Sequence, residues 1–389
     1  MSAPDAATAR YFRRLRRRRR ASADGRLETF AGAFAVLREV IVDFARCSGR
    51  AGGEPPESVA GLDEAAELYR FAPGFLRLDG LRRPRLPWRR PRLQRPQLRT
   101  LLATLATDGA SPAAPRLAGP RLLVLRYEYA NFFHVVTDWY NAFLVQRFLD
   151  LPSVSVILAD GHPATPLDAG WPTLFGDVTR ISTLMPRAAR FERLVLPPLG
   201  WDSALLAHRA RALPLAEDFR RFVLGAHRLT VDAPRRPGPL RVTLVRRDDY
   251  RAHARSRPGQ LRRKLANEAA LVAALQALGD VVVRVATFEE LALREQLALV
   301  VDTDVLVGMH GAGLTHALFL PASAGVVELF PISQSPRTRH FRSLARWRRL
   351  FYVRWQNRDP AREHADHRTE VPPAVVVYAV RRYAARAKG

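Results

Sequence analysis

The second half of the chain alternates between short, continuous apolar runs and longer stretches in which apolar residues recur every three or four positions. The short runs predict buried strands, and the longer stretches predict helices. Strands separated by helices of this length indicate βαβ units, and therefore a parallel sheet that is covered on both faces. The predicted strands are 241–245, 280–286, 305–308 and 325–330, and the predicted helices are 261–278, 289–302 and 311–320.

The middle of the chain has a similar pattern. Apolar runs at 121–126, 153–158 and 191–196 predict strands, and the apolar-rich segment 131–149 predicts a long helix. Loops with proline and glycine separate these segments. We therefore expect a second α/β domain before the one already described.

Proline and arginine mark the expected boundaries. The short segment PRRPGP (234–239) is the clearest internal linker, so we expect one α/β domain at 27–233 and another at 240–372. Residues 1–26 form an arginine-rich, low-complexity arm that we expect to be disordered. Residues 80–99 hold eight arginines and four prolines, which excludes a regular helix and predicts an extended surface linker.

The net charge of the chain is large, but it does not by itself favour a nucleic-acid-binding protein. The 62 basic and 37 acidic residues leave a formal net charge of +25, which raises nucleic acid as a partner. Only Lys264 and Lys388 are lysines, however, whereas a surface evolved to bind phosphate normally uses lysine as well as arginine. We therefore favour the codon bias of a GC-rich genome as the explanation and expect no nucleic-acid partner.

The cysteine content and the lengths of the apolar runs bear on whether the protein has a disulfide, a membrane anchor or a signal peptide. Cys47 is the single cysteine, so an intramolecular disulfide is excluded. No run of about 18 uncharged apolar residues indicates a membrane anchor. The arginines that begin at Arg10 are not followed by the apolar core of a signal peptide, so we expect neither anchor nor signal in this sequence.

The segment DVLVGMHGAGLTHALFLPASAGVVELFP (304–331) contains the strongest candidate site. A predicted strand ends before His310, and a helix begins near Ala312. His310 and the backbone amides of Gly311 to Gly313 are therefore expected at the carboxyl end of a parallel strand, where open α/β sheets bind ligands and a helix N-terminus stabilises a diphosphate. Glycine lets the backbone approach phosphate oxygens. The alternative is that these glycines serve only the packing of a tight turn.

Charged residues flank this loop. Glu328 interrupts an apolar strand, and a buried acid is costly unless it is paired. Its carboxylate would either accept hydrogen bonds from ribose hydroxyls or pair with an arginine. Arg246 and Arg247 directly follow the strand 241–245, a position suited to neutralising a diphosphate. In so arginine-rich a chain they could equally form a solvent-facing loop.

The predicted helix 131–149 carries a second candidate site. His134 and Asp138 are four residues apart and therefore share one helix face. His134 could act as a general base oriented by Asp138, or Asp138 could be the base itself. Both residues could also merely brace the helix. A metal site needs about three protein ligands, and no third ligand has convincing spacing, so we expect no metal.

These segments, in this order, resemble glycosyltransferase family 61. The block HGAGLTHALFLPASAGVVELFP is highly specific, and RYEYANFFHVVTDWYNAFL, ILADGH and RLVLPPLGWDSALL are most similar to the plant-type β-1,2-xylosyltransferases that add xylose to the N-glycan core. The resemblance covers residues 121 to about 332. It implies an inverting, metal-independent enzyme of the GT-B type, with two Rossmann-like domains and an interdomain cleft. Domain 27–233 would bind the acceptor, and domain 240–372 would bind the nucleotide sugar.

The resemblance and the residue patterns together assign three sets of site residues. The catalytic candidates are His134 and Asp138. The donor-binding candidates are Arg246, Arg247, His310, Gly311, Ala312, Gly313, Thr315 and Glu328. The acceptor-side candidates are Tyr129, Asn131, Trp139, Asp160 and His162.

The leading functional expectation is transfer of xylose from UDP-xylose to a glycoprotein N-glycan. The UDP-sugar is a substrate, and no cofactor is expected. The resemblance implies a location in the Golgi or the endoplasmic-reticulum lumen. One alternative is transfer of GlcNAc from UDP-GlcNAc to protein hydroxyls or O-glycans. An alternative from a different class is a non-catalytic protein that binds glycans or nucleic acid.

Overall fold

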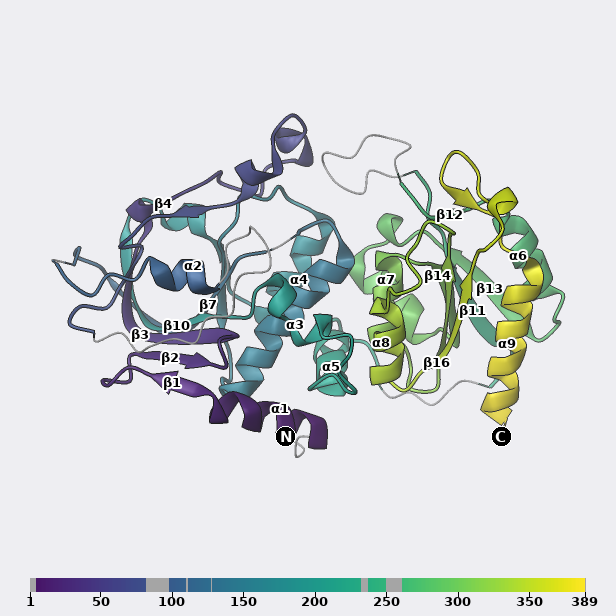
Figure 1. Cartoon of the computed structure of the whole chain (residues 1–389), viewed down its shortest axis with the longest axis horizontal. Coiled ribbons are helices and arrows are strands. Elements are labelled where there is room, and N and C mark those ends of the chain that lie inside the picture. Colours follow the sequence, from purple (N-terminus) through teal and green to yellow (C-terminus); the bar gives the residue numbers. More distant parts are fainter. Residues whose placement is uncertain are drawn as a thin grey trace. The chain divides into compact units, whose positions relative to one another are not determined.

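The chain forms two compact units in a computed structural model that describes residues 5–81, 98–109, 111–126, 128–231, 237–249 and 261–388 (Figure 1). The first unit comprises residues 1–130 and 134–207, and the second comprises 131–133 and 208–389. Residues 234–236 of the expected linker at 234–239 lie outside the described residues. The observed division comes earlier in the chain, before α5 (Ala216–Ala226). On α5, Arg220 donates a hydrogen bond to the carbonyl of Phe319, which ties this helix to the second unit.

The first unit is built on an eight-stranded mixed sheet with the strand order β1-β2-β3-β10-β7-β8-β9, with β6 pairing with β3. Strands β1, β2, β3 and β10 pair antiparallel, whereas β10, β7, β8 and β9 run parallel. The bounds are β1 (Arg19–Ala21), β2 (Leu27–Phe30), β3 (Phe34–Asp43), β6 (Leu76–Arg77), β7 (Arg116–Val124), β8 (Ser155–Leu158), β9 (Val178–Arg180) and β10 (Ala188–Leu196).

The expected elements of this half are present. The strands expected at 121–126, 153–158 and 191–196 correspond to β7, β8 and β10, and the long helix expected at 131–149 is α3 (Phe132–Phe148). Shorter helices are α2 (Leu98–Ala103) and α4 (Gly170–Phe175). Of the expected linker 80–99, residues 82–97 lie outside the described part of the chain.

The N-terminal arm differs from the disordered segment that its composition predicts. Residues 6–17 form the helix α1 (Ala6–Arg17), and Asp5 caps it by accepting hydrogen bonds from the amides of Ala7 and Thr8. Thr8, Phe12 and Leu15 are buried. Their spacing places them on one helix face, so the helix docks along that face while its arginines occupy the others.

The single cysteine lies in the two-stranded sheet formed by β4 (Cys47–Ser48) and β5 (Arg70–Phe71). The Cys47 thiol is buried and donates to the carbonyl of Phe44 at 3.3 Å. Burial raises the pKa of this thiol to about 12.

The second unit contains a fully parallel five-stranded sheet with the order β13-β11-β14-β15-β16. This confirms the parallel arrangement expected from the alternating pattern. The strands are β11 (Leu240–Val245), β13 (Val281–Ala286), β14 (Val305–Met309), β15 (Gly325–Phe330) and β16 (Phe351–Gln356). Besides α5, the α-helices are α6 (Glu268–Gln276), α7 (Leu293–Val301), α8 (His340–Trp347) and α9 (Pro373–Lys388).

Helices cover both faces of this sheet. Figure 1 shows α6 and α9 on one side of it and α7 and α8 on the other. Buried residues of α6 and α9 form one apolar cluster with β11, β14 and β15. The unit therefore extends beyond the expected limit at 372 and includes α9, because Val376, Val380 and Tyr383 complete that cluster.

All three helices expected in this half are shorter than their patterns predict. The helix expected at 289–302 is α7, which starts only at Leu293 and ends at Val301. In place of a helix over 261–278, β12 (Lys264–Leu265) pairs with β17 (Arg368–Thr369), and α6 starts only at Glu268. The ammonium group of Lys264 bonds both carboxylate oxygens of Asp249 at 2.8 and 2.9 Å, which holds this segment in an extended conformation. The helix expected at 311–320 is a 3₁₀ helix, η9 (Ala312–Leu318).

Candidate functional site

The parallel pairing of β11 and β14 brings two expected donor-site segments to one edge of the sheet. Val245 is in register with Gly308, so the residues that follow β11 and β14 leave the sheet side by side. Arg246 and Arg247 follow β11, and His310 follows β14. This is the carboxyl edge, where parallel sheets bind their ligands.

His310 is held by a buried cluster of polar side chains. Its Nδ1 lies 2.5 Å from Oε1 of Glu328, and the Tyr352 hydroxyl donates to Oε2 of Glu328 at 2.5 Å. His310 and Glu328 are 6% and 1% exposed, and the imidazole stacks on the ring of Phe330 with centroids 4.8 Å apart. Because Glu328 engages Nδ1, Nε2 is the ring nitrogen through which His310 would contact a ligand.

Within the protein, Glu328 pairs with side chains other than the arginine considered in the sequence, and the ribose contact considered there stays a prediction. Both carboxylate oxygens are engaged by His310 and Tyr352, and no arginine pairs with Glu328 among the residues that the structure describes. Burial and the adjacent Glu328 raise the pKa of Tyr352, so its hydroxyl stays a proton donor. Tyr352 was missed because the half-buried strand FYVRWQ carries an arginine and lacks a clean apolar run.

The two arginines after β11 have different positions. A Cβ built on Gly311 would lie 3.0 Å from Cζ of Arg247, so this guanidinium lies directly against the glycine turn. Arg246 instead forms an ion pair with Glu268, with Nη2 and Oε1 2.6 Å apart. Arg247 is therefore the arginine that the structure places at the loop.

The glycines of the loop also have different surroundings. A Cβ on Gly313 would lie 2.9 Å from Cγ1 of Val245 and 3.4 Å from the ring of Phe288, so Gly313 permits close packing of η9 on the sheet. Gly311 faces Arg247. Thr315 is fully buried, and its hydroxyl has no hydrogen-bond partner within the described part of the chain. His310 and Gly311 are therefore the residues of this loop that a ligand could approach most closely.

His316 anchors η9 and was not identified from the sequence. Its ring stacks between Phe132 and Phe288, with centroids 4.4 and 4.0 Å away. Its Nδ1 lies 2.8 Å from the carbonyl of Gly313, and its Nε2 lies 3.1 Å from Oε1 of Gln296. Burial lowers the pKa of His316 to about 4, so the ring is neutral at pH 7 and can donate through only one of its two nitrogens.

Two buried arginines hold the other end of η9. Arg348 donates to the carbonyls of Leu318 at 3.1 Å and Leu320 at 2.7 Å, and Arg220 donates to Phe319 at 3.3 Å. Carbonyls at the end of a helix lack partners within it, and these guanidinium groups supply them. The loop that carries His310 is therefore fixed at both ends.

The catalytic candidates lie on α3. His134 is half-buried, and Asp138, one turn later, is 4% exposed. Asn141 lies on the same face and is buried; its side chain donates to the carbonyl of Pro198 at 3.0 Å and accepts from Ser203 at 2.6 Å. Asn141 thus ties the loop LPPLGWDS to this face of α3, a role that the sequence did not indicate.

The aromatic acceptor-side candidates are in the interior. Tyr129 is 1% exposed and stacks on His162, and Trp139 is fully buried against Gly170, where any Cβ would clash with the indole. Asn131 accepts a hydrogen bond from the amide of Phe133 at the start of α3. Tyr129 and Trp139 are acceptor-side candidates from the sequence, and the structure places both rings in the core, where such apolar surface is most stable.

Asp160 and His162 belong to a buried ionic network at the carboxyl ends of β7, β8 and β9. Arg126 binds both oxygens of Asp160 at 2.7 and 2.8 Å and reaches Asp168 at 2.5 Å. His162 lies 2.5 Å from Glu67. Burial alone would raise the pKa of Asp160, but Arg126 and the neighbouring cations hold it well below its usual range. The network couples the edge of the sheet to residues far away in the sequence.

Among the described residues, no three His, Cys, Asp or Glu side chains gather as a metal site requires. Within the same ranges, every helix is too short or too polar to cross a membrane.

Comparison with known proteins gives consistent matches. A sequence model of the family described as Glycosyltransferase 61 matches residues 126–327, just over half of the chain. A β-1,2-xylosyltransferase from Oryza sativa subsp. japonica is 30% identical over 77% of this chain and 63% of its own length. A β-1,2-xylosyltransferase from Arabidopsis thaliana is 30% identical over 60% of this chain and 51% of its own length. An EGF domain-specific O-linked N-acetylglucosamine transferase from Gallus gallus is 36% identical over 59% of this chain and 43% of its own length.

Proposed function

The chain belongs to glycosyltransferase family 61, and on that premise we propose that it transfers a sugar from a nucleotide-sugar donor to a glycan or glycoprotein hydroxyl. The observation that carries this proposal is the His310–Glu328–Tyr352 cluster beside Arg247 at the carboxyl edge of the parallel sheet. We further propose inversion at the anomeric carbon, no requirement for a metal, and the GT-B type with two Rossmann-like domains.

The donor side would stabilise the leaving group. As the bond between the anomeric carbon and the β-phosphate oxygen breaks, negative charge builds up on the departing diphosphate. The Arg247 guanidinium and a protonated Nε2 of His310 would neutralise that charge, and Gly311 leaves room for the phosphate oxygens. Glu328 fixes the orientation of His310 through Nδ1, as carboxylates orient catalytic imidazoles elsewhere.

The acceptor side would supply the base. We propose that His134 removes the proton of the acceptor hydroxyl, because it is half-buried whereas Asp138 is almost completely buried. Asp138 would then position His134 from the next turn of α3. Direct proton removal by Asp138 is the competing mechanism.

Two substitutions distinguish these mechanisms. His134→Ala should lower kcat by about 10²–10⁴, the usual contribution of a general base, while UDP affinity and thermal stability stay near the wild-type values. Asp138→Asn should lower kcat less if Asp138 only positions the histidine. A larger loss for Asp138→Asn would make Asp138 the base. Near-normal kcat in both variants would remove the pair from the mechanism.

For the donor we propose xylose from UDP-xylose and, for the acceptor, a glycoprotein N-glycan, because two matched relatives are named β-1,2-xylosyltransferases. The chain spans 63% and 51% of the length of these relatives, so the substrates are proposals drawn from their names. GlcNAc transfer from UDP-GlcNAc to protein hydroxyls is the second candidate, because other relatives are named for that activity. A Golgi or endoplasmic-reticulum location is part of the same proposal, and microscopy of the tagged protein tests it.

The decisive experiment measures hydrolysis and transfer across several UDP-sugars with EDTA present. Transfer from UDP-xylose to a mannose-containing N-glycan supports the leading proposal, and transfer from UDP-GlcNAc to a protein hydroxyl supports the second. Failure to bind any UDP-sugar, together with tight, salt-sensitive binding of RNA, would overturn both.

A further inference from the structure

Four exposed arginines form one face of the helix α1. They recur at the i, i+3, i+4 and i+7 spacing that places residues on the same face of an α-helix. These residues are Arg10, Arg13, Arg14 and Arg17, and we call them the arginine ridge. The buried residues Thr8, Phe12 and Leu15 occupy the opposite face. At a rise of 1.5 Å per residue, the ridge is about 10 Å long.

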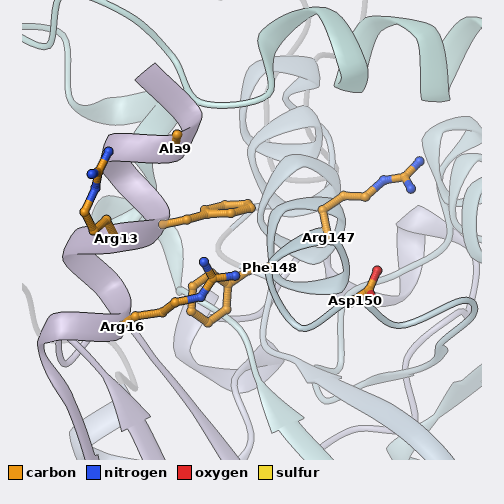
Figure 2. Close-up of a pocket in the computed structure, with 7 residues that line it drawn as sticks. Ala9, Arg13, Arg16, Arg147, Phe148 and Asp150 are labelled. Atoms are coloured by element: carbon orange, nitrogen blue, oxygen red, sulfur yellow. The ribbon is translucent and has the colours of Figure 1, made fainter. Parts of the chain in front are cut away.

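The fold holds the arginine ridge in place. The ring of Phe12 meets that of Phe148, on α3, edge to face with centroids 5.1 Å apart. Directly after α1, strand β1 pairs with β2, which fixes the chain beyond the ridge. Figure 2 shows Arg13 directed away from the space between α1 and α3, whereas Arg16 lies over the ring of Phe148, 5.4 Å from its centre. The ridge therefore faces outward on a fixed helix, and it is not a solvated tail.

Carboxylates do not neutralise the charge of the ridge. Within the described ranges, no ion pair joins a residue of the ridge to Asp or Glu. Asp5, at the N-cap, is the acidic residue nearest to the ridge in the sequence. Burial opposes its ionisation, but hydrogen bonds from Thr8 and Ala7 and the charge of Arg10 lower its pKa. One neighbouring carboxylate thus stands against four guanidinium groups.

The arginine content of the chain does not by itself explain the ridge. Codon preference decides between arginine and lysine, but it does not decide where basic residues gather. Positions 10–20 hold eight arginines and no acidic residue. By contrast, Arg116 is exposed elsewhere in the first unit and pairs with Glu39, with Nη2 and Oε1 2.8 Å apart. Uncompensated charge is therefore a property of this helix and not of every exposed arginine.

We propose that the arginine ridge docks the protein on an anionic lipid surface. A leaflet that contains anionic lipids presents negative charge over an extended area, and guanidinium groups bind its phosphate and carboxylate oxygens. Each arginine held near such a surface strengthens binding by about fivefold. The ridge has no large apolar side chain that would insert among the acyl chains, so the attraction depends on charge and is screened by salt.

A lipid surface fits the ridge better than a nucleic acid does. The helix α1 has no Asn or Gln with which to read base edges. Phe12 is buried, and the Arg14 guanidinium lies over the half-buried Tyr11, 5.1 Å from the ring centre. The helix therefore presents no fully exposed aromatic ring on which a base could stack. Docking on a lipid surface requires none of these features.

The test compares two matched variants of the full chain. Arg10→Gln, Arg13→Gln, Arg14→Gln and Arg17→Gln together remove the four charges of the ridge. Arg358→Gln, Arg381→Gln, Arg382→Gln and Arg386→Gln remove four charges from exposed positions of the second unit. Tm should stay near the wild-type value in both, because glutamine is a good helix former and exposed substitutions change stability little. The double variant Arg13→Gln with Arg17→Gln gives an intermediate charge.

Binding is measured by co-sedimentation with phosphatidylcholine vesicles that do or do not contain phosphatidylserine, so the result does not depend on catalysis. The wild type should prefer the phosphatidylserine vesicles and should be released at about 0.5 M NaCl. The ridge variant should lose affinity by ~100-fold or more and the double variant by ~10-fold or more, while the control variant keeps most of it. No preference for phosphatidylserine, a loss as large in the control as in the ridge variant, or ridge-dependent binding of RNA alone would overturn the proposal.

Discussion

At the scale of single residues, Glu328 gives the sharpest test of the donor site. Glu328→Gln removes the carboxylate that orients His310, so we expect kcat to fall at least tenfold, which corresponds to a loss of about 1.4 kcal/mol or more of electrostatic stabilisation of the transition state. Tyr352→Phe removes only the hydroxyl that bonds the other oxygen of Glu328, and it should have a smaller effect. Steady-state kinetics of both variants check this order.

Binding measurements then separate two roles of Glu328. If it acts through His310, Glu328→Gln should weaken UDP and free diphosphate equally. If it contacts ribose, as the sequence first suggested, UDP should be weakened more than diphosphate. A variant with unchanged affinity and unchanged kcat would exclude both roles.

Two glycines of the same loop make a matched pair. Alanine at Gly311 would meet the Arg247 guanidinium, whereas alanine at Gly313 would meet Val245 in the core. Gly311 has an extended backbone that alanine adopts without strain, with φ at 172°. We expect Gly311→Ala to weaken UDP binding ~10-fold at unchanged Tm, and Gly313→Ala to lower Tm through overpacking that costs about 1–3 kcal/mol.

Calorimetry of UDP binding and of thermal unfolding measures both effects. The opposite pattern, with a lower Tm for Gly311→Ala and weaker UDP binding for Gly313→Ala alone, would move the phosphate contact to Gly313.

At the scale of elements, the η9 segment should give the second unit a pH-dependent stability. Burial lowers the pKa of His316 to about 4 from 6.5, so the unfolded chain binds a proton first as the pH falls. The contribution of His316 to the free energy of unfolding is therefore fully present above pH 6.5. It is lost as the pH falls toward 4, at about 1.4 kcal/mol per pH unit.

His316→Asn is the control for this pH dependence. Chemical denaturation at several pH values should show a steeper loss of stability in the wild type than in His316→Asn between pH 6.5 and 4. The difference between the two proteins isolates His316 from His208 and His227, whose pKa values are also lowered by burial. Parallel curves for the two proteins would show that His316 does not titrate in this window.

Most of the parallel sheet could be predicted from the sequence because its central strands β11, β14 and β15 are almost entirely buried and appear as continuous apolar runs. Strand β13 could be predicted as well because, although mostly half-buried, it is also rich in valine. The last strand of that sheet could not, because every residue of β16 is only half-buried and polar residues interrupt the run. In α1, abundant arginines obscured the three spaced positions that dock the helix. Local sequence patterns predict an element when its residues are strongly and continuously buried. They miss elements whose stability comes from a few tertiary contacts.

The candidate site shows the same limit. His310 and Arg247 were predicted because they directly follow strands of the parallel sheet. Tyr352 and Arg126 act through partners that are distant in the sequence, at Glu328 and Asp160, and no spacing rule connects them. Trp139 was predicted as an acceptor-side residue but lies in the core, and sequence alone does not separate the two because aromatic residues serve both cores and binding sites.

At the scale of the whole molecule, α3 belongs to both compact units. Phe132, at its start, groups with the second unit and stacks on His316, whereas Phe143 groups with the first unit. Phe132→Ala should cost about 3–5 kcal/mol and speed hydrogen exchange over residues 312–318. Phe143→Ala should cost a similar amount but speed exchange in the first unit. Equal acceleration in both units for either variant would show that they unfold as one.

The buried cysteine has a practical consequence for such measurements. A thiol with a pKa near 12 holds almost no thiolate at neutral pH, and thiolate is the species that maleimides and iodoacetamides attack. The wild-type chain should therefore remain unlabelled in its native state. A cysteine introduced at an exposed position, such as Arg13 or Arg358, would then be the sole reporter, ready for a fluorophore or spin label without first removing Cys47.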